Sequence, residues 1–534
     1  MNQTKRSGIA NRFFCLFAAV LVAPCGLPHD WTAGARAAGG VLRLTTADEE
    51  SRQAIPSRLE LRTESGKSAR VRRTIVSGPG IVLDRTLDLP LSNGAYRFRI
   101  VRGPEYRVVT GNFVIEPAAE GERLIEMSRM VDMRAEGFLS GDLAYSGPST
   151  DLSLLMAAED LHVVTRVSPG ERGDRDSGGD KAPSRRSRPA AVTQKTDEVA
   201  ADEANAEPIW TGQVATDHDG LLVYPPRTES LNDESPDGDQ IDGTRIAIAD
   251  PFAWQLPVWL ATGRIDGFFL LGDWLREDRR IDRIGSGRPP AEIGFKGEQG
   301  PGRYAEFVYW QLLETGLRPA PLAGTGPSET GSAAGYNRTY AIGQSLLDDD
   351  DRRVAPVADE AEFYDAVWAG RSVLTNGPLL RPTLGGYAPG HVFNASDGEQ
   401  LSMSVELHLA VRDPVDYVEV IHNGGVIYSA RLDDFAKTQG VIPPFDFRSS
   451  GWVIVRVVTQ FEEHYRAAIS APWFIDFDHS PRISKSAVEF FGQWLTDYET
   501  ELKKLPPERL APHIKPVRTA RGFWRQRLQQ ANVD

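Results

Sequence analysis

A change in hydrophobic periodicity near residue 135 is the feature that most constrains the fold of this chain. Before it, short runs such as LELRTES and AYRFRIV alternate apolar and polar residues at period two. After it, strand-forming runs alternate with amphipathic segments that end at glycine, such as Gly263, Gly316 and Gly370. Period-two runs predict antiparallel sheets, whereas alternating strands and helices predict a parallel α/β sheet, open or closed into a barrel. We therefore predict an α/β region over residues 135–383.

Helix caps and apolar faces locate four strand–helix units in this region. The first has a strand at 138–145 and a helix capped by Ser149 or Thr150, with Leu152, Leu155 and Met156 on one face. In the second, Asp250 followed by Pro251 reads as an N-cap with proline at the first helical position. Two further helices are expected at 302–316 and 359–370. Four tryptophans on these helices stand at core-like positions: Trp254, Trp259, Trp310 and Trp368.

The α/β region is flanked by segments of other composition. Residues 38–134 and 384–478 predict antiparallel β-sandwiches, and Asn423-Gly424 predicts the tight turn of a hairpin in the second. The first contains no clustered acid, histidine or nucleophile, so it reads as an accessory or docking module. Residues 479–534 predict amphipathic helices that pack back on the body. An insertion at 168–208 has no aromatic residue and almost no large apolar one, which predicts disorder.

The N-terminus predicts export. Lys5, Arg6 and Arg12 precede an apolar segment at 13–23 that is too short to span a bilayer, and Ala35-Arg36-Ala37 offers a cleavage site. Residues 1–37 therefore read as a signal peptide of a periplasmic or extracellular protein. Both cysteines, Cys15 and Cys25, fall within it, so no disulfide or cysteine ligand is expected in the mature chain.

Composition bounds the class of partner. With 534 residues, 41% hydrophobic and 25% charged, the chain is an ordinary globular one that should divide into several domains. Its formal net charge is −14, and removal of residues 1–37, with four basic residues and one acidic residue, makes it −17. Such a surface repels phosphate backbones, so nucleic acid is not an expected partner. No later stretch is long and apolar enough for a membrane helix.

Polar residues at the predicted strand ends are the candidate site, because parallel α/β folds bind ligands there. No phosphate-binding loop, dinucleotide fingerprint, HExxH or GxSxG motif accompanies them. The candidates are Asp142, Tyr145, Asp217, His218, Asp273, Asn337, Arg338 and Asn376.

Several ordered blocks resemble the PHP superfamily. They are GFLSGDLAYSG with LLMAAEDLHVV, PFAWQLPVWLATGRIDGF, GRYAEFVYWQLLETGLRPAPLAGTG, GYNRTYA and AGRSVLTNGPLLR, over about residues 95–500. They are most similar to its exported branch, which includes carbaryl-hydrolase-type metallohydrolases. The resemblance implies a distorted (β/α)7 barrel with metal ions held by histidines and carboxylates at the strand ends, and accessory β-domains.

The metal motifs of that family are degenerate here. Where relatives carry GDLHxH this chain has GDLAYS, which matches Asp142 but leaves Ala144 and Ser146 at the two histidine positions. Asp273 and Trp274 stand near where the family often has a histidine, and AGTGPS at 323–328 replaces a late Asp-x-His motif. We therefore expect no metal; zinc or manganese would be required if the chain is an enzyme.

Alternatives remain for individual residues. VATDHDG at 214–220 reads as a compact turn, with a Thr-Asp-His metal site as the alternative. His162, between two apolar strand residues, reads as a hydrogen-bonded structural histidine. Asn337, Arg338 and Asn376 read either as ligands for a polar or anionic molecule or, for Asn376-Gly377-Pro378, as turn chemistry.

Three functions are compatible with this sequence. The first is a PHP-like protein that has lost its metal site and acts as a binding or structural module for a small-molecule or cell-envelope ligand. The second is a metal-dependent hydrolase of esters, amides or phosphoesters with a rearranged site around Asp142, Asp217, His218 and Asp273. The third is an extracellular adhesion or assembly protein that uses its β-sandwiches.

Overall fold

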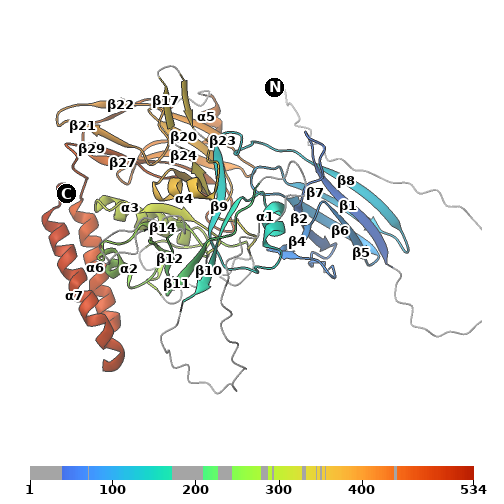
Figure 1. Ribbon diagram of the computed structural model, residues 1–534, viewed down its shortest axis with the longest axis horizontal. Coiled ribbons are helices and arrows are strands. Elements are labelled where there is room, and N and C mark those ends of the chain that lie inside the picture. Colours follow the sequence, from blue (N-terminus) through green and yellow to red (C-terminus); the bar gives the residue numbers. More distant parts are fainter. Residues whose placement is uncertain are drawn as a thin grey trace, which may run out of the picture.

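The computed structural model describes residues 39–534 with internal gaps (Figure 1). The gaps are at residues 70, 171–207, 227–242, 278–286, 291–293, 327–331, 344, 349–350, 355 and 438–441. The predicted signal segment and all but the ends of the predicted disordered insertion lie outside the described residues. The described part is α/β in class, mostly sheet with some helices, as the sequence predicts.

The N-terminal part is a pair of facing sheets, drawn in blue in Figure 1. Its strands are β1 (Gly40–Asp48), β2 (Ser57–Thr63), β3 (Val76–Ser77), β4 (Gly80–Leu83), β5 (Thr86–Leu91), β6 (Gly94–Val101), β7 (Val109–Ile115) and β8 (Glu120–Met127). The order is β5-β1-β8 in one sheet and β3-β4-β2-β6-β7 in the other. Leu42 and Leu44 from one sheet pack against Leu59, Leu61 and Ile100 from the other. The predicted sandwich is therefore present, although β1 and β8 pair in parallel rather than antiparallel.

The central part begins with strand–helix–strand units. Its strands are β9 (Phe138–Tyr145), β10 (Val163–Pro169), β11 (Val214–His218), β12 (Leu221–Tyr224), β13 (Arg245–Ile248), β14 (Gly267–Leu271), β15 (Ala320–Ala323), β16 (Arg338–Ile342), β17 (Ser345–Asp348), β18 (Asp351–Val354) and β19 (Ser372–Thr375). Its helices are α1 (Leu152–Ala158), α2 (Leu256–Leu260), α3 (Gly300–Glu314) and α4 (Glu360–Trp368). Leu152, Leu155 and Met156 of α1 are buried, which confirms the predicted apolar face.

The central sheet is parallel except at two places. β9, β10 and β11 are parallel, as are β13, β14 and β15. β12 is antiparallel to both its neighbours. It is antiparallel to β11 because the chain reverses through Asp219 (φ 57°) and Gly220 (φ 103°) without a crossover helix. The second place is β16, which is antiparallel to both its neighbours, β9 and β19. A bridge between Tyr145 and Gly326 brings the segment after β15 back to the end of β9.

Two predicted helix starts differ from the structure. The Asp250 side chain accepts a hydrogen bond from Phe252 N (2.9 Å), but α2 begins only at Leu256. Asp250-Pro251 therefore forms a turn that precedes the helix rather than its cap. α1 follows Asp151 in the left-handed region (φ 59°), without a side-chain cap from Ser149 or Thr150.

The C-terminal part continues the central sheet. Its strands are β20 (Leu379–Leu384), β21 (Val392–Ala395), β22 (Leu401–Met403), β23 (Val405–Ala410), β24 (Val415–His422), β25 (Gly425–Ala430), β26 (Phe445–Phe447), β27 (Gly451–Thr459), β28 (Ala467–Ser470) and β29 (Trp473–Phe477). β28 pairs with β19, so one 15-stranded sheet crosses the predicted boundary at 383/384. Asn423 (φ 50°) and Gly424 (φ 75°) form the β24–β25 turn, as predicted.

Three helices complete the chain: α5 (Leu432–Lys437), α6 (Lys485–Leu502) and α7 (Pro507–Gln529). α6 and α7 lie side by side at one end of the molecule, drawn in red in Figure 1. Trp494 and Trp524 are buried in the core that also holds the central and C-terminal strands, and Trp524 Nε1 donates to Pro257 O (3.0 Å). The prediction that these helices pack on the body is confirmed. Within the described ranges, no helix has both the length and the apolar composition to cross a membrane.

Candidate functional site

The carboxylate of Asp142, near the end of β9, is fully enclosed by hydrogen-bond donors. Its Oδ1 accepts from Ala144 N (3.1 Å) and Thr325 N (2.9 Å), and its Oδ2 accepts from Gly335 N (2.9 Å) and from the Thr325 hydroxyl. A carboxylate offers about four lone-pair sites. All of them are used within the protein.

The Gly324–Gly326 loop reaches the carboxylate because its glycines permit a close approach. A Cβ on Gly324 would lie 2.6 Å from Ala144 N and 2.9 Å from Asp142 Oδ1. Gly326 has φ +88° and packs against the backbone and Cβ of Asp273. The loop that the sequence shows as lacking metal ligands thus supplies two of the four donors that satisfy Asp142, both from Thr325.

Burial controls the protonation of this group. Burial raises the pKa of Asp142, and the hydrogen bonds from Thr325, Gly335 and Ala144 offset part of that rise. Tyr145 is also buried, and its hydroxyl donates to Pro148 O (3.3 Å). Burial, and then the nearby Asp142 charge, raise the pKa of Tyr145 to about 12, so the phenol stays protonated at neutral pH.

A bulge separates Asp142 from the next strand positions. Asp142 pairs with Val164, and Tyr145 pairs with Arg166. An advance of three residues along β9 therefore matches an advance of two residues along β10. A bulge interrupts the simple alternation of side chains between the two faces. The regular two-residue spacing on which the family motif relies is therefore broken between Asp142 and Ser146. Ser146 instead donates its hydroxyl to Gly326 O (3.3 Å).

Asp217 and His218 belong to the β11–β12 hairpin. Asp217 Oδ1 accepts from Gly220 N (2.9 Å), and His218 is exposed at the end of β11. The sequence predicts a compact turn over VATDHDG, but Val214–His218 is strand β11 and the turn is confined to Asp219 and Gly220. Asp217 and His218 do not join Asp142. Asp273, by contrast, is buried beside the Gly324–Gly326 loop.

Asn337, Arg338 and Asn376 are buried and bound to backbone. Asn337 Nδ2 donates to Gly272 O (2.9 Å) and Leu275 O (3.0 Å), which flank Asp273. Arg338 donates to Gly335 O (2.7 Å), Asp160 O (3.3 Å) and Glu159 O (3.1 Å). Asn376 donates to Tyr465 O (3.0 Å) and accepts from Ala467 N (2.9 Å). Asn337 and Asn376 thus hold loops together, and Arg338 ties the loop at Gly335 to the turn after α1.

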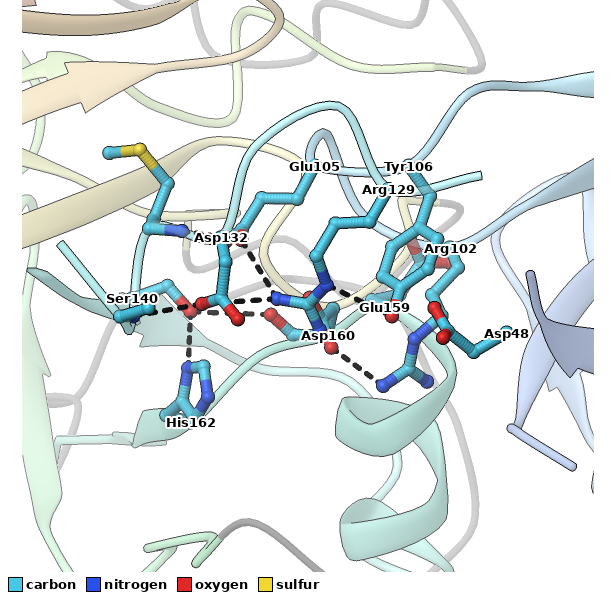
Figure 2. Close-up of polar contacts among 12 residues, drawn as sticks. Asp48, Arg102, Glu105, Tyr106, Arg129, Asp132, Ser140, Glu159, Asp160 and His162 are labelled. Atoms are coloured by element: carbon cyan, nitrogen blue, oxygen red, sulfur yellow. Dashed lines mark hydrogen bonds and ion pairs between the residues drawn. The ribbon is translucent and has the colours of Figure 1, made fainter. Parts of the chain in front are cut away.

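A buried charge network joins the N-terminal sheets to the turn after α1. Figure 2 shows Arg102 and Arg129 converging on Asp160, at 2.6 Å and 3.4 Å from its two carboxylate oxygens. Arg129 also contacts Glu105 (3.2 Å). Although burial opposes ionisation, Arg102 and Arg129 hold the pKa of Asp160 below its ordinary value. Burial and then the Asp160 charge raise the pKa of Glu105.

The same network contains His162, with its Nδ1 2.9 Å from Ser140 Oγ (Figure 2). Both residues are buried, which confirms the prediction of a structural histidine. Sequence analysis missed this junction, because Arg102 and Arg129 stand just after β6 and β8, where a charge looks solvated. At the neighbouring buried pair of Arg58 and Glu60 (3.0 Å), opposite charges two residues apart on β2 were the available signal.

The fit of a metal ion can be judged from these contacts. Asp142 has no free lone pair, and Ala144 and Ser146 carry no imidazole. In the part of the chain that the structure describes, no three His, Cys, Asp or Glu side chains gather as a metal site requires. The residues present do not fit the metal centre that the family resemblance implies.

No protein-family model matches the chain, and no curated protein sequence matches it. Among solved structures, it is similar to the Bacillus anthracis TIE protein, with 18% identity, a TM-score of 0.14, and coverage of 21% of this chain and 19% of that one. The Streptococcal ancillary pilin gives 13% identity, a TM-score of 0.15 and coverage of 21% and 38%. The fibronectin(III)-like modules of Clostridium thermocellum CbhA give 18% identity, a TM-score of 0.13, and coverage of 28% of this chain and 66% of that one. The chain thus spans about a fifth of the first of these, and TM-scores this low support no conclusion about fold or function.

Proposed function

We propose that this protein is an exported relative of PHP-type metallohydrolases whose metal position is closed, and that it serves as a binding or structural module. The observation that carries the proposal is the enclosure of Asp142 by four internal donors. A metal ligand must offer a lone pair to the ion, and each lone pair of this carboxylate already accepts a hydrogen bond.

The position of the donors supports the same view. Thr325 lies in the segment that stands where the family has a ligand motif, and it donates twice to Asp142. Gly335 N, from the loop before β16, provides a third hydrogen bond. The carboxylate therefore joins the end of β9 to two loops, a task that stabilises the fold without any reaction.

The test is the substitution Asp142→Asn, with and without metal. An amide has one oxygen and would turn its NH2 group toward one or two of the backbone N–H groups. Each buried donor left unsatisfied costs about 1–3 kcal/mol, so we expect a loss of about 3 kcal/mol in the free energy of unfolding. Thermal and urea unfolding of chelator-treated protein should show this loss equally with and without added Zn²⁺ or Mn²⁺.

The matched control is Asp84→Asn, because this carboxylate is exposed and lies 3.4 Å from the adjacent Arg85. It should change stability by less than about 0.5 kcal/mol. A rise in the wild-type unfolding temperature on adding Zn²⁺ or Mn²⁺ that disappears in Asp142→Asn would show that Asp142 is a ligand. Metal-dependent hydrolysis of simple esters or phosphoesters by the wild type would equally contradict the proposal.

A further inference from the structure

A cleft lies where the N-terminal sheets, the central part and the C-terminal sheets meet. It is narrow and opens to solvent, with about 30 Å³ of space that can hold the centre of a water-sized sphere. Its lining is dominated by arginine, with contributions from strands and loops far apart in the sequence. The arginines are Arg58, Arg99, Arg338, Arg412 and Arg466.

The charges of these arginines are not fully balanced. Four carboxylates form ion pairs with them: Glu60, Glu159, Glu277 and Asp413. Arg58 alone contacts three of these, including both glutamates that line the cleft, at 2.5 Å and 2.9 Å. Among the described residues, five guanidinium groups thus face four carboxylates, and three of the four carboxylates contact Arg58. Of the described carboxylates, only Asp413 pairs with Arg466 beside Arg412, so that side of the cleft carries an excess of positive charge among the described residues.

Two arginines on that side have unused hydrogen-bonding capacity. Arg412 donates Nη1 to Gly103 O (2.8 Å) and forms no ion pair within the residues that the structure describes. Arg466 is only 9% exposed; it binds Asp413 (2.7 Å) and the Tyr336 hydroxyl (2.8 Å), while its buried Nε has no partner in the described ranges.

Crowding of like charges is visible at Arg412. Burial, and next the charge of Arg466, lower the pKa of Arg412 to about 10; Arg99 acts in the same direction, and the charges of Asp413 and Glu159 oppose it in part. A cation held near other cations in a partly buried cleft is stabilised by an anion that neutralises them.

We propose that this cleft binds a tetrahedral oxyanion, a phosphate or sulfate group, through Arg412, Arg466 and Arg99. Guanidinium groups form charge-assisted hydrogen bonds to such oxygens in pairs. A tetrahedral group presents four oxygens in different directions, so three arginines from different elements can contact it at once. A carboxylate ligand has only two oxygens in one plane and could not bind all three arginines in this way. Gly335, whose N–H donates to Asp142, lines one side of the cleft, but Asp142 itself does not line it, and the proposal does not depend on whether the central part has kept any activity.

The test is calorimetric titration of the whole mature protein at low ionic strength with inorganic phosphate, methyl phosphate and sulfate. The key variant is Arg412→Gln, which loses one hydrogen bond to a backbone carbonyl and should therefore lose no more than about 1.5 kcal/mol in the free energy of unfolding. Loss of a charged donor should weaken binding about ten- to hundredfold. The matched control is Arg448→Gln, which removes the same charge from an exposed residue bonded to Gln400 and should leave binding unchanged.

Each outcome decides the proposal. Binding of phosphate or sulfate that Arg412→Gln weakens and Arg448→Gln does not would support it. Tighter binding of methyl phosphate than of phosphate assigns the site to the phosphorylated end of an organic ligand, and the reverse assigns it to the free ion. No binding of any of the three at about 10 mM, or binding that survives Arg412→Gln, would overturn it. These outcomes are independent of the metal test on Asp142.

Discussion

Replacement of Arg58 by methionine should be among the most damaging single changes in this chain. Arg58 lies on β2 of the N-terminal sheets, and its guanidinium contacts Glu60 at 3.0 Å, Glu159 at 2.5 Å and Glu277 at 2.9 Å. The last two belong to the central part, so this one side chain connects two regions. Methionine keeps most of the apolar stem and removes only the charge and its donors.

The magnitude follows from burial. The Arg58 side chain is 3% exposed and that of Glu159 is 5% exposed. Removing one member of a buried ion pair leaves the other charge without compensation and costs about 3–5 kcal/mol. Burial already raises the pKa of Glu159 against the opposing effect of Arg58. Without Arg58 this carboxyl can escape the penalty by taking up a proton, so the deficit should be smaller at pH 5 than at pH 8.

The assay is urea unfolding followed by tryptophan fluorescence at both pH values. Arg43→Met is the control, because Arg43 forms an exposed pair with Asp88 (2.8 Å) and should lose less than about 1 kcal/mol. A loss below about 1 kcal/mol in Arg58→Met, similar to that of the control, would refute the reasoning. A deficit of the same size at pH 5 and pH 8 would show that packing, rather than the unpaired carboxylate, carries the effect.

Two further changes test other parts of the structure. Folding raises the pKa of Glu105 from 4.5 to about 8, so between these pH values the folded protein holds a proton that the unfolded chain releases. The contribution of this proton to the free energy of unfolding is fully present below pH 4.5 and is lost as the pH rises through 8. Glu105→Gln keeps the neutral form and should unfold with a weaker pH dependence than wild type between pH 5 and 8; equal slopes would contradict this. Gly324→Ala places a Cβ 2.6 Å from Ala144 N and should cost about 1–3 kcal/mol by urea unfolding. Gly492→Ala, in α6 with nothing within 4 Å, should instead stabilise by about 0.5–1 kcal/mol, and a gain in both variants would refute the packing argument.

Local features of the fold could be predicted because their causes are local. Period-two runs gave the facing sheets, and Asn423-Gly424 gave a hairpin turn, since that dipeptide accepts positive φ. The pairing of β9 with β16 and of β19 with β28 could not be predicted in this way. Periodicity shows which face of a strand is buried but carries no information about its partner.

The candidate site was predictable to a similar extent. Asp142 could be identified from its place at the end of a strand, but its donors Thr325 and Gly335 lie more than 180 residues away. The arginine cleft was predictable only in part: Arg338 and Asn376, which the sequence offered as ligands for a polar or anionic molecule, line it, but its other arginines could not be found. Arg58, Arg412 and Arg466 each look like a solvated charge on a strand or loop until the three regions are brought together.

The pairing of β19 with β28 determines how this chain can be divided. Cutting between residues 383 and 384 would divide β20 and separate it from β23. It would also separate Val373, Leu374 and Thr375 from Ser470, Ile469 and Ala468, and so leave unpaired edges on each product. Open edges of this kind recruit other strands, and each half expressed alone should therefore aggregate. Expressed together, the two halves hold complementary edges and should reassemble as a split protein, because every backbone hydrogen bond lost at the cut sheet can form again between chains.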